Sequence, residues 1–170
     1  MPRFVLPDPA YLASYTEARQ EYLRHGVTTH AFDDAGAYDI FAKYENYRQA
    51  RDLPPGRVGE GRWWLVDGEA AFIGEVSLRY RLNQALLHHG GHIGYGVRYS
   101  EWGKGYGTQL LRFALEQAQK RGMDRVLVTC LDTNLASARV IEKNGFVLEN
   151  KVADTLDVRP VLFRRYWKEL

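Results

Sequence analysis

Apolar and aromatic residues recur at helical spacing in two stretches before residue 52. Between residues 8 and 24, Leu12, Tyr15 and Tyr22 approximate one helical face, and Asp8 can cap the helix. A second helical pattern begins near residue 33 or 34 and runs to about residue 51, before a Pro-Pro-Gly run breaks it. The aromatic residues of both helices favour packing over a core, and lining of a substrate cleft is the alternative.

The next stretch has the two-residue alternation of β-strands. Residues 63–66 and 71–78 are rich in β-forming residues, and the Asp67-Gly68 turn signal between them predicts a hairpin. Residues 83–91 then form a connection to a strand over residues 91–98. Further strands are predicted at 125–129, 146–149 and 160–167, with a polar connection between the last two.

Helical spacing returns twice in the second half of the chain. The apolar residues of the first helix fall on one face, at Leu110, Leu111, Ala114, Leu115 and Ala118. A shorter helix is predicted at Asn134 to Asn144, ending at Gly145. The strand, helix and strand between residues 92 and 129 imply a parallel pair joined by a right-handed crossover.

Three alternate glycines, Gly103, Gly105 and Gly107, stand between the strand over residues 91–98 and the first of these helices. Glycine permits positive φ angles and lets a ligand approach the main chain. The free amides and the dipole of the helix start attract an anion, and Lys104 adds a positive charge. The segment therefore favours a phosphate cradle, with an ordinary tight turn as the alternative.

Glu75 is the first candidate base. It stands among apolar residues, and on strict alternation it shares a face with Ile73 and Ser77. Partial burial would raise the pKa of its carboxyl and suit it to proton abstraction. A solvated glutamate at a sheet edge is the alternative.

His92 is the second candidate base. It shares a strand face with Gly94 and Gly96, and glycine inside a strand often marks close approach by a ligand. His92 would then look along an open groove toward the glycine loop. The alternative is that a helix packs into this groove and that His92 is only hydrogen-bonded.

Two other reactive residue types give weaker signals. His88, His89 and His92 lie within five residues, but without a cysteine or an ordered carboxylate set we expect no metal. Cys130 is the only cysteine, so no internal disulfide is possible. At the end of an apolar strand it favours packing, and acyl carriage is the alternative.

Composition narrows the class of protein. A chain of 170 residues suits one domain, which can bury about 70% of its unfolded surface. With 23 basic and 21 acidic residues the net charge is only +2, so we expect neither nucleic acid nor membrane as a partner. Charged residues in the first 25 positions, the lone cysteine and the lack of a long apolar run favour a cytoplasmic protein. Monomer and homodimer both remain open.

The order of these motifs resembles a known family. The glycine loop with its helix, then Asn134-x-x-Ser137, then the run from Glu142 to Phe146, resembles the GNAT superfamily of acyl-CoA-dependent N-acetyltransferases. The last five positions of the family signature fit Gly103 to Gly107, but its first, Arg or Gln, is Trp102 here. The resemblance covers about residues 63–167. It implies an α+β (mixed α/β) fold: a mainly antiparallel central sheet of about six to seven strands with a splayed parallel pair, flanked by about four helices.

By position, the resemblance implies that main-chain groups hold acetyl-CoA. The backbone amides of residues 102–108 would hold the pyrophosphate. The backbone of residues 96–98 would pair with pantetheine and polarise the thioester, and Asn134 and Ser137 would sit beside the pantetheine arm. The implied cofactor-binding residues are Gly96, Val97, Arg98, Trp102, Gly103, Lys104, Gly105, Tyr106, Gly107, Thr108, Asn134, Ser137 and Lys143.

The resemblance also leaves a gap in the expected catalytic set. Many members carry a general-acid tyrosine seven residues after the asparagine, where this chain has Ile141. The loss is tolerable, because a thiolate of pKa ~8.5 leaves without much help. Deprotonating the amine is harder, since a lysine-like amine of pKa ~10.4 is neutral in only about one molecule in 2500 at pH 7. Glu75 and His92 are the candidate bases, with Tyr95 third.

The predicted function is therefore acetyl transfer from acetyl-CoA to a primary amine, by direct attack in a ternary complex. We expect one N-acetyltransferase domain over residues 1–170, in which residues 1–60 shape the acceptor side and residues 63–167 carry the sheet and the acetyl-CoA site. One alternative is a catalytically silent acyl-CoA-binding regulatory module. Another, a phosphate-loop nucleotide enzyme, is disfavoured because the loop lacks a Gly-Lys-Ser/Thr ending.

Overall fold

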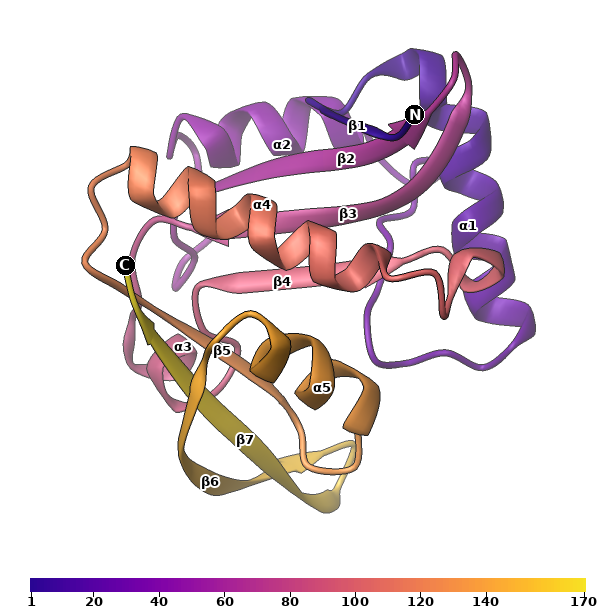
Figure 1. Cartoon of the computed structure of the whole chain (residues 1–170). Coiled ribbons are helices and arrows are strands. Elements are labelled where there is room, and N and C mark those ends of the chain that lie inside the picture. Colours follow the sequence, from indigo (N-terminus) through magenta and orange to yellow (C-terminus); the bar gives the residue numbers. More distant parts are fainter.

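The computed structural model describes residues 1–170 as helices around two antiparallel sheets (Figure 1). One sheet has the strand order β1-β2-β3-β4 and the other β5-β7-β6. The strands are β1 (Arg3–Val5), β2 (Glu60–Asp67), β3 (Ala71–Arg79), β4 (Ile93–Val97), β5 (Arg125–Leu131), β6 (Val147–Leu156) and β7 (Arg159–Glu169). The helices are α1 (Leu12–Arg24), α2 (Ile40–Arg48), α3 (Gln84–His88), α4 (Tyr106–Lys120) and α5 (Leu135–Lys143). Single 3-10 turns occur at Pro9–Tyr11 and Tyr99–Glu101.

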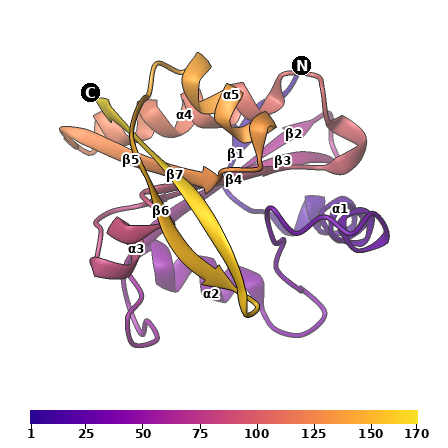
Figure 2. The same cartoon turned by 90° about the horizontal axis from the view of Figure 1, so that it is seen from below.

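The expected α+β fold class is confirmed. The seven strands agree with the predicted six to seven, and the five helices are one more than predicted. Helices α4 and α5 cover one face of the sheets, and α1 and α2 lie on the opposite side (Figure 2). Each side has its own apolar cluster, one around α4 and one in which aromatic residues of α1 and α2 pack on β2 and β3. No helix is both long and apolar enough to cross a membrane.

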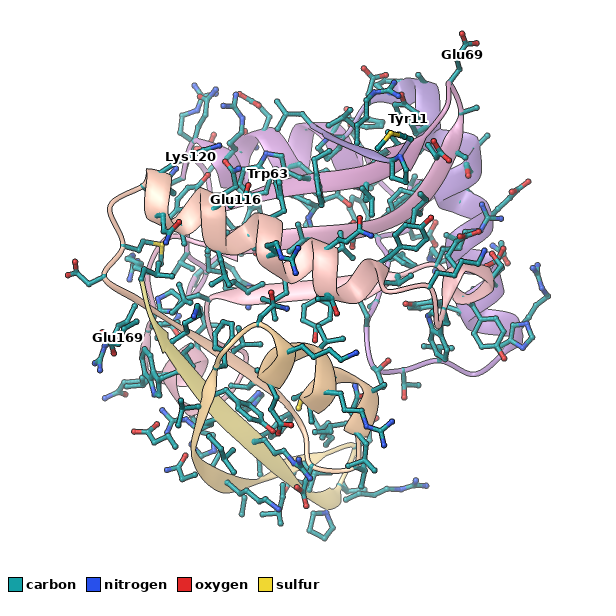
Figure 3. All side chains as sticks on the ribbon, in the orientation of Figure 1. Tyr11, Trp63, Glu69, Glu116, Lys120 and Glu169 are labelled. Carbon is teal, nitrogen blue, oxygen red and sulfur yellow. The ribbon has the colours of Figure 1, made fainter.

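Helix α4 has the amphipathic pattern that its sequence predicts. All five residues of the expected apolar face, from Leu110 to Ala118, are buried. On the opposite face, Glu116 and Lys120 are exposed (both labelled in Figure 3). Burial of this face fixes the helix on β3 and β4, so the start of α4 is held at the end of β4.

The two sheets meet at β4 and β5, which run in the same direction and diverge (Figure 1). Where the strands are close, His92 N–H donates to Leu127 O at 2.8 Å. No ladder continues from there, because β4 pairs only with β3, and β5 only with β7. The predicted parallel pair, joined through α4, is thus present in its splayed form, and β4 keeps one edge free of strand pairing.

A bulge in β3 decides which way Glu75 points. The register between β2 and β3 shifts at Leu65/Val66 and leaves Ile73 as an extra residue. Ile73 packs in the cluster around α4, whereas Glu75 lies on the other face, beside Trp64. The expectation that Glu75 and Ile73 share a face is wrong, because strict alternation does not hold across a bulge.

Three other boundaries differ from the sequence prediction. Helix α2 begins only at Ile40, because the Asp39 carboxylate caps it by accepting from two backbone N–H groups. The predicted connection over residues 83–91 contains the short helix α3. The polar segment between the last two strands continues both, in one hairpin that turns at Asp157 and Val158 with φ of +47° and +60°. A valine in that conformation is unusual, so its sequence gives no turn signal.

Candidate functional site

The glycines between β4 and α4 are required for two different reasons. Gly103 and Gly105 have φ of +78° and +83°, and a Cβ on either would meet no atom within 4 Å. Gly107 is already helical, and its Cβ would lie 3.3 Å from Val140 Cγ2 and 3.8 Å from Tyr95 Cε2. The first two glycines therefore serve the backbone turn, while Gly107 lets α4 pack closely against α5 and β4.

The main chain from Gly103 to Thr108 presents a row of N–H groups that have no acceptor within the protein. The first helical bond is the one from Gln109 N–H to Gly105 O. Free amides at a helix N-terminus, with its positive dipole end, form a site suited to a phosphate group. Trp102 differs from the expectation, since its amide donates to Tyr99 O at 3.1 Å.

Lys104 and Lys143 are the two lysines expected at this site. Lys104 is exposed, with its ammonium 2.9 Å from the Glu101 carboxylate. Lys143 is an exposed residue of the last turn of α5 and makes no ion pair. Neither ammonium is fixed by burial, so main-chain amides are the ordered part of the anion site.

The free edge of β4 exposes alternate backbone groups. Arg98 N–H donates to Ile73 O and Arg79 N–H to His92 O, both at 2.7 Å, which sets the phase of the β3–β4 ladder. Even-numbered residues of β4 therefore bond to β3, and Tyr95 and Val97 turn their N–H and C=O groups to the free edge. For Gly96 and Arg98 the expected pairing with pantetheine is wrong. Gly96 bonds to Glu75 of β3, and Arg98 donates its N–H to Ile73 O while its carbonyl accepts from Glu101 N–H at 2.9 Å.

Side chains partly cover the end of this edge. The Val97 carbonyl accepts hydrogen bonds from Tyr22 OH at 2.6 Å and from Trp102 Nε1 at 2.8 Å. The Arg98 guanidinium turns to α1, where it pairs with Glu21 at 2.7 Å and Glu17 at 3.0 Å. Thus Val97 N–H and the backbone groups of Ile93 and Tyr95 are the groups of β4 that remain without a partner.

Tyr95 links β4 to α5. Its hydroxyl lies 2.7 Å from Ser137 Oγ, and burial raises the pKa of the Tyr95 phenol. Asn134 caps α5, because its Oδ1 accepts from Ser137 N–H at 3.1 Å. The structure therefore brings together three of the expected site residues, Tyr95, Asn134 and Ser137. They lie beside the point where β4 and β5 diverge, which we call the split.

A cavity of about 190 Å³ lies next to this group. Asn134 and Ser137 line it together with residues of β5, the β6–β7 hairpin and the segment that joins α1 to α2. Cys130 also lines it, and burial raises the pKa of its thiol to about 11. A thiol with that pKa is protonated at neutral pH, so Cys130 contributes packing here.

Glu75 is buried in a network of charges. Its side chain has no exposed surface, and its carboxylate accepts from Arg62 Nη1 and lies beside His30 Nε2, both at 2.8 Å, with Trp64 Nε1 at 3.3 Å. Burial by itself would raise the pKa of Glu75, but the charge of Arg62 and the contact with His30 outweigh it and lower the pKa. Both sequence interpretations, a high pKa and a solvated edge position, are therefore wrong.

His30 is the residue of this group that sequence reasoning missed. It lies in the connection between α1 and α2, 45 residues from Glu75, and its ring covers Gly96 of β4. No local motif surrounds it in the sequence. The bare face at Gly96 did signal a partner, but the partner is this loop histidine and not a helix.

His92 does not face an open groove. Its side chain is buried, and Nδ1 accepts a hydrogen bond from Leu127 N–H at 2.9 Å, at the closed end of the split. Burial, with further contributions from Arg79 and Arg125, lowers its pKa to about 4. The expectation of an open groove is therefore wrong, whereas the alternative of a hydrogen-bonded His92 is confirmed, since the imidazole replaces a strand-pairing group between β4 and β5.

His88 and His89 turn to the β6–β7 hairpin. Their Nε2 atoms lie 3.4 and 2.9 Å from Asp154 Oδ2. His92 is bound to β5 instead, so the three histidines do not converge. No cluster of three or more His, Cys, Asp or Glu side chains in the chain is arranged to hold a metal ion.

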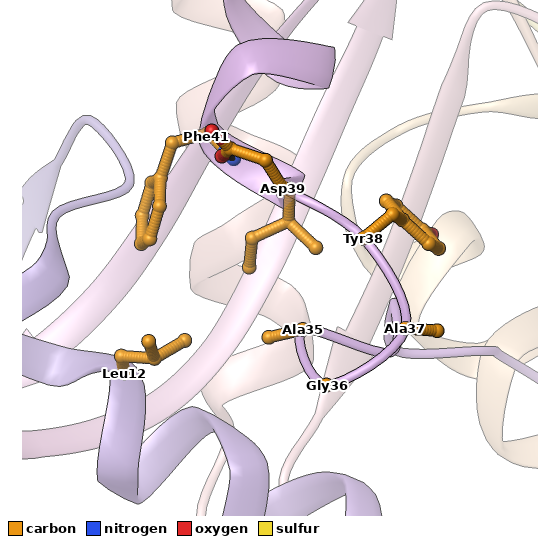
Figure 4. A pocket seen from close by; sticks show the side chains of 8 residues that line it. Leu12, Ala35, Gly36, Ala37, Tyr38, Asp39 and Phe41 are labelled. Carbon is orange, nitrogen blue, oxygen red and sulfur yellow. Dashed lines mark hydrogen bonds between the residues drawn. The ribbon is translucent and has the colours of Figure 1, made fainter.

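A larger cavity, about 360 Å³, lies between the start of α1 and residues 35–41 (Figure 4). Its lining is mostly apolar, and its only charged residue, Asp39, already caps α2. Its lining offers no charged side chain that is free to bind a ligand, so the split between β4 and β5 is the better candidate site.

Comparisons with known proteins find acetyltransferases. The family model described as an acetyltransferase (GNAT) domain matches residues 3–147. A search of curated protein sequences finds no match. Among solved structures, the microcin C7 self-immunity acetyltransferase in complex with acetyl-CoA and AMP superposes with a TM-score of 0.76 at 16% identity, over 99% of this chain and 92% of that chain.

Two enzymes named for ribosomal proteins have similar folds. One, from Salmonella typhimurium, modifies the N-terminal serine of ribosomal protein L7/L12; it has a TM-score of 0.73 at 16% identity, covering 99% of this chain and 95% of that chain. The other is the ribosomal-protein-S5-alanine acetyltransferase of Vibrio fischeri, with a TM-score of 0.74 at 18% identity, covering 99% and 92%.

Proposed function

Because this chain belongs to the GNAT acetyltransferases and is an acetyl-CoA-dependent acyltransferase, we propose that it acetylates a primary amine by direct attack in a ternary complex. The observation that carries the proposal is the row of acceptor-free amides from Gly103 to Thr108, which opens onto the free edge of β4. When bound, acetyl-CoA supplies an acyl thioester with a carbonyl carbon that an uncharged amine can attack.

The residues present fit this cosubstrate. The amides of Gly103 to Thr108 hold the pyrophosphate, with Lys104 and Lys143 as mobile charges at its rim. The edge groups of Tyr95 and Val97 pair with the pantetheine arm, in place of Gly96 and Arg98. Trp102 contributes through its indole, which covers the end of β4, and not through its amide.

Asn134 and Ser137 flank the pantetheine arm. The side-chain N–H groups of Asn134 make no hydrogen bond within the protein, because only its Oδ1 is used by the cap. Ser137 Oγ and Tyr95 OH form a hydroxyl pair that can donate to the sulfur as the thiolate leaves. Since a thiolate leaves readily, we assign this pair a minor effect on the rate.

Proton removal from the amine requires another group. Glu75 is ion-paired with buried Arg62 and has no exposed surface, so it acts through its neighbours and does not itself take the proton. His92 stabilises the closed end of the split. Residues 1–60, which contain α1, α2 and the connection between them, shape the acceptor side.

The first experiment is a thermal-melting series with acetyl-CoA. At about 100 times Kd the cosubstrate should add about 2.7 kcal/mol to the free energy of unfolding, whereas ATP should add none. The second is acetyl transfer to a panel of amines that includes lysine side chains, peptide N-termini and small polyamines. A melting shift without transfer to any amine would indicate the silent acyl-CoA-binding module. No shift with acetyl-CoA would contradict the cosubstrate site itself.

A further inference from the structure

The imidazole ring of His30 lies over Gly96 of β4. A Cβ built on Gly96 would lie 2.6 Å from His30 Cγ and 2.9 Å from its Nε2, so only glycine leaves room for the ring. This face of Gly96 is the one that Glu75 shares, opposite to the α4 side. The His30 side chain is 18% exposed, which leaves part of the ring accessible to solvent.

The contact with Glu75 fixes which ring nitrogen carries the hydrogen. Glu75 is ionised beside Arg62, and an ionised carboxylate can only accept hydrogen bonds. His30 Nε2, 2.8 Å away, must therefore be the donor. In the neutral ring Nδ1 is then the basic nitrogen. Nδ1 has no hydrogen-bond partner in the protein and is not among its buried atoms.

The network behind His30 keeps Glu75 from acting as the base itself. Arg62 donates to Glu75 and, at 2.7 Å, to Glu60. On the other side Asp33 accepts from Lys43 at 2.7 Å and from Tyr44 OH at 2.7 Å. The titratable groups of this cluster come from β2, β3, α1, α2 and the connection between α1 and α2: Glu60, Arg62, Glu75, Tyr15, Tyr22, Asp33, Lys43 and Tyr44. None of these groups offers a free basic nitrogen, whereas His30 does.

The segment that carries His30 also borders the cofactor side. Thr28 and Thr29, directly before it, line the 190 Å³ cavity together with Asn134 and Ser137. The same short segment thus connects the cavity beside the pantetheine residues to the ring over Gly96. A base at the position of the His30 ring serves an amine that enters from the side of α1 and α2.

We propose that His30 is the general base of the acetyl transfer and that Glu75 is a positioning residue that holds its Nε2–H tautomer; this inference rests on the proposed N-acetyltransferase function. The amine nitrogen bonds to the thioester carbonyl carbon, and the C–S bond breaks with its electron pair going to sulfur. The proton lost by the nitrogen passes to His30 Nδ1 and then to solvent. An amide and a thiolate result, the thiolate takes up a proton from solvent to become the thiol, and no other reactant is needed.

The decisive variant is His30→Gln, with His25→Gln as the matched control. A glutamine amide can still donate toward Glu75 but has no basic nitrogen. We expect kcat/KM for a lysine-like amine to fall about 100-fold or more, the usual contribution of a general base, and to fall less for an α-amine. The melting shift with acetyl-CoA should stay at the wild-type value, because the cosubstrate site does not include His30. His25 is exposed at the end of α1, so its variant should match wild type.

A second pair of variants tests the position of the His30 ring and leaves residue 30 itself unchanged. Gly96→Ala should displace His30 and lower kcat, whereas Gly94→Ala, with a Cβ 3.4 Å from Ser77 Oγ, should be tolerated. Equal loss in both variants, or wild-type kinetics in Gly96→Ala, would overturn the proposal.

Nitrogen NMR of the ligand-free protein gives a readout independent of activity. We expect the Nε2–H tautomer for His30, and a mixture of tautomers in Glu75→Gln. An Nδ1–H tautomer in the wild-type protein would overturn the proposal even if no amine substrate is found. His30→Gln with an unchanged rate would overturn it while leaving the proposed function in place. Lack of transfer by the wild-type protein would contradict the function instead.

Discussion

The two sides of strand β4 present different kinds of groups, backbone on one side and side chains on the other. On the α4 side, the candidate acetyl-CoA site consists mainly of backbone N–H groups set by glycine conformations, and its charged residue Lys104 is exposed. On the α1 and α2 side, the candidate acceptor site consists of side chains, with Glu75 fully buried against Arg62 and His30.

This difference has consequences for stability and for function. A backbone site at a helix start costs little in folding, because its groups stay in contact with water until a ligand binds. A buried charge cluster is costly unless every partner is present, because each ion has lost its water. We therefore expect single substitutions to damage the acceptor side through folding and the cofactor side through binding.

The largest effect should come from removing the charge that balances Glu75. Arg62→Met should lower the free energy of unfolding by about 3–5 kcal/mol, because it leaves a buried carboxylate without its ion pair. On the other side, Lys104→Met removes an exposed pair and should cost at most about 1 kcal/mol. Denaturant unfolding measures both.

A double variant shows whether burial of charge is the cause. Arg62→Met combined with Glu75→Gln should recover part of the loss, since both members of the pair are then neutral. If Arg62→Met costs no more than Lys104→Met, the contrast between the two sides does not hold.

The next effect is a pH dependence that separates the closed end of the split from the acceptor side. The His92 pKa is about 4 in the folded protein and near ~6.5 unfolded, so its contribution of up to about 3 kcal/mol is complete above ~6.5 and is lost as pH falls toward 4. Glu75, Asp33 and Glu21 have lowered pKa values, so their contribution is present above the unfolded carboxyl pKa of about 4 and is lost only below it.

Unfolding curves from pH 7 to pH 3 test this separation. His92→Gln keeps an acceptor for Leu127 N–H but does not titrate, so it should flatten the curve between pH 6.5 and 4. The decline below pH 4 should remain, because the acceptor-side carboxylates are unchanged. A wild-type slope in His92→Gln would assign the upper window to another group.

The smallest effect compares two glycines with the same strain. Gly105 and Gly122 have φ of +83° and +74°, and neither would bring a Cβ within 4 Å of another atom. Alanine at either position should cost about 1–2 kcal/mol of stability. Only Gly105→Ala should also weaken acetyl-CoA binding, by about tenfold in Kd, because Gly105 lies in the amide row. Calorimetric titration of both variants measures this, and equal Kd values would contradict the cradle.

Sequence reasoning succeeded where the cause is local. The positive φ of Gly103 and Gly105, the buried face of α4 and the Asn134 cap each depend on residues within a few positions, so their spacing predicts them. The same reasoning attributed Gly107 to the loop, although its role is to fit against Val140 of another helix.

The acceptor side followed from contacts that no local pattern contains. The bulge at Ile73 reverses the face of Glu75, and alternation in the sequence cannot reveal an extra residue. The His30 contact joins positions 45 residues apart. The ladder phase that assigns Arg98 to β3 also depends on how two strands pair in space.

By itself, then, the sequence determined the family, the order of the helices and strands other than β1 and α3, and the candidate backbone cradle before α4. Glycine torsions and helix periodicity are short-range properties. The tertiary structure alone decided that Glu75 is a buried partner, that His92 closes the split, and that His30 lies over Gly96. These three outcomes depend on burial and on charges brought together from distant segments, which set both the pKa of a side chain and the direction in which it points.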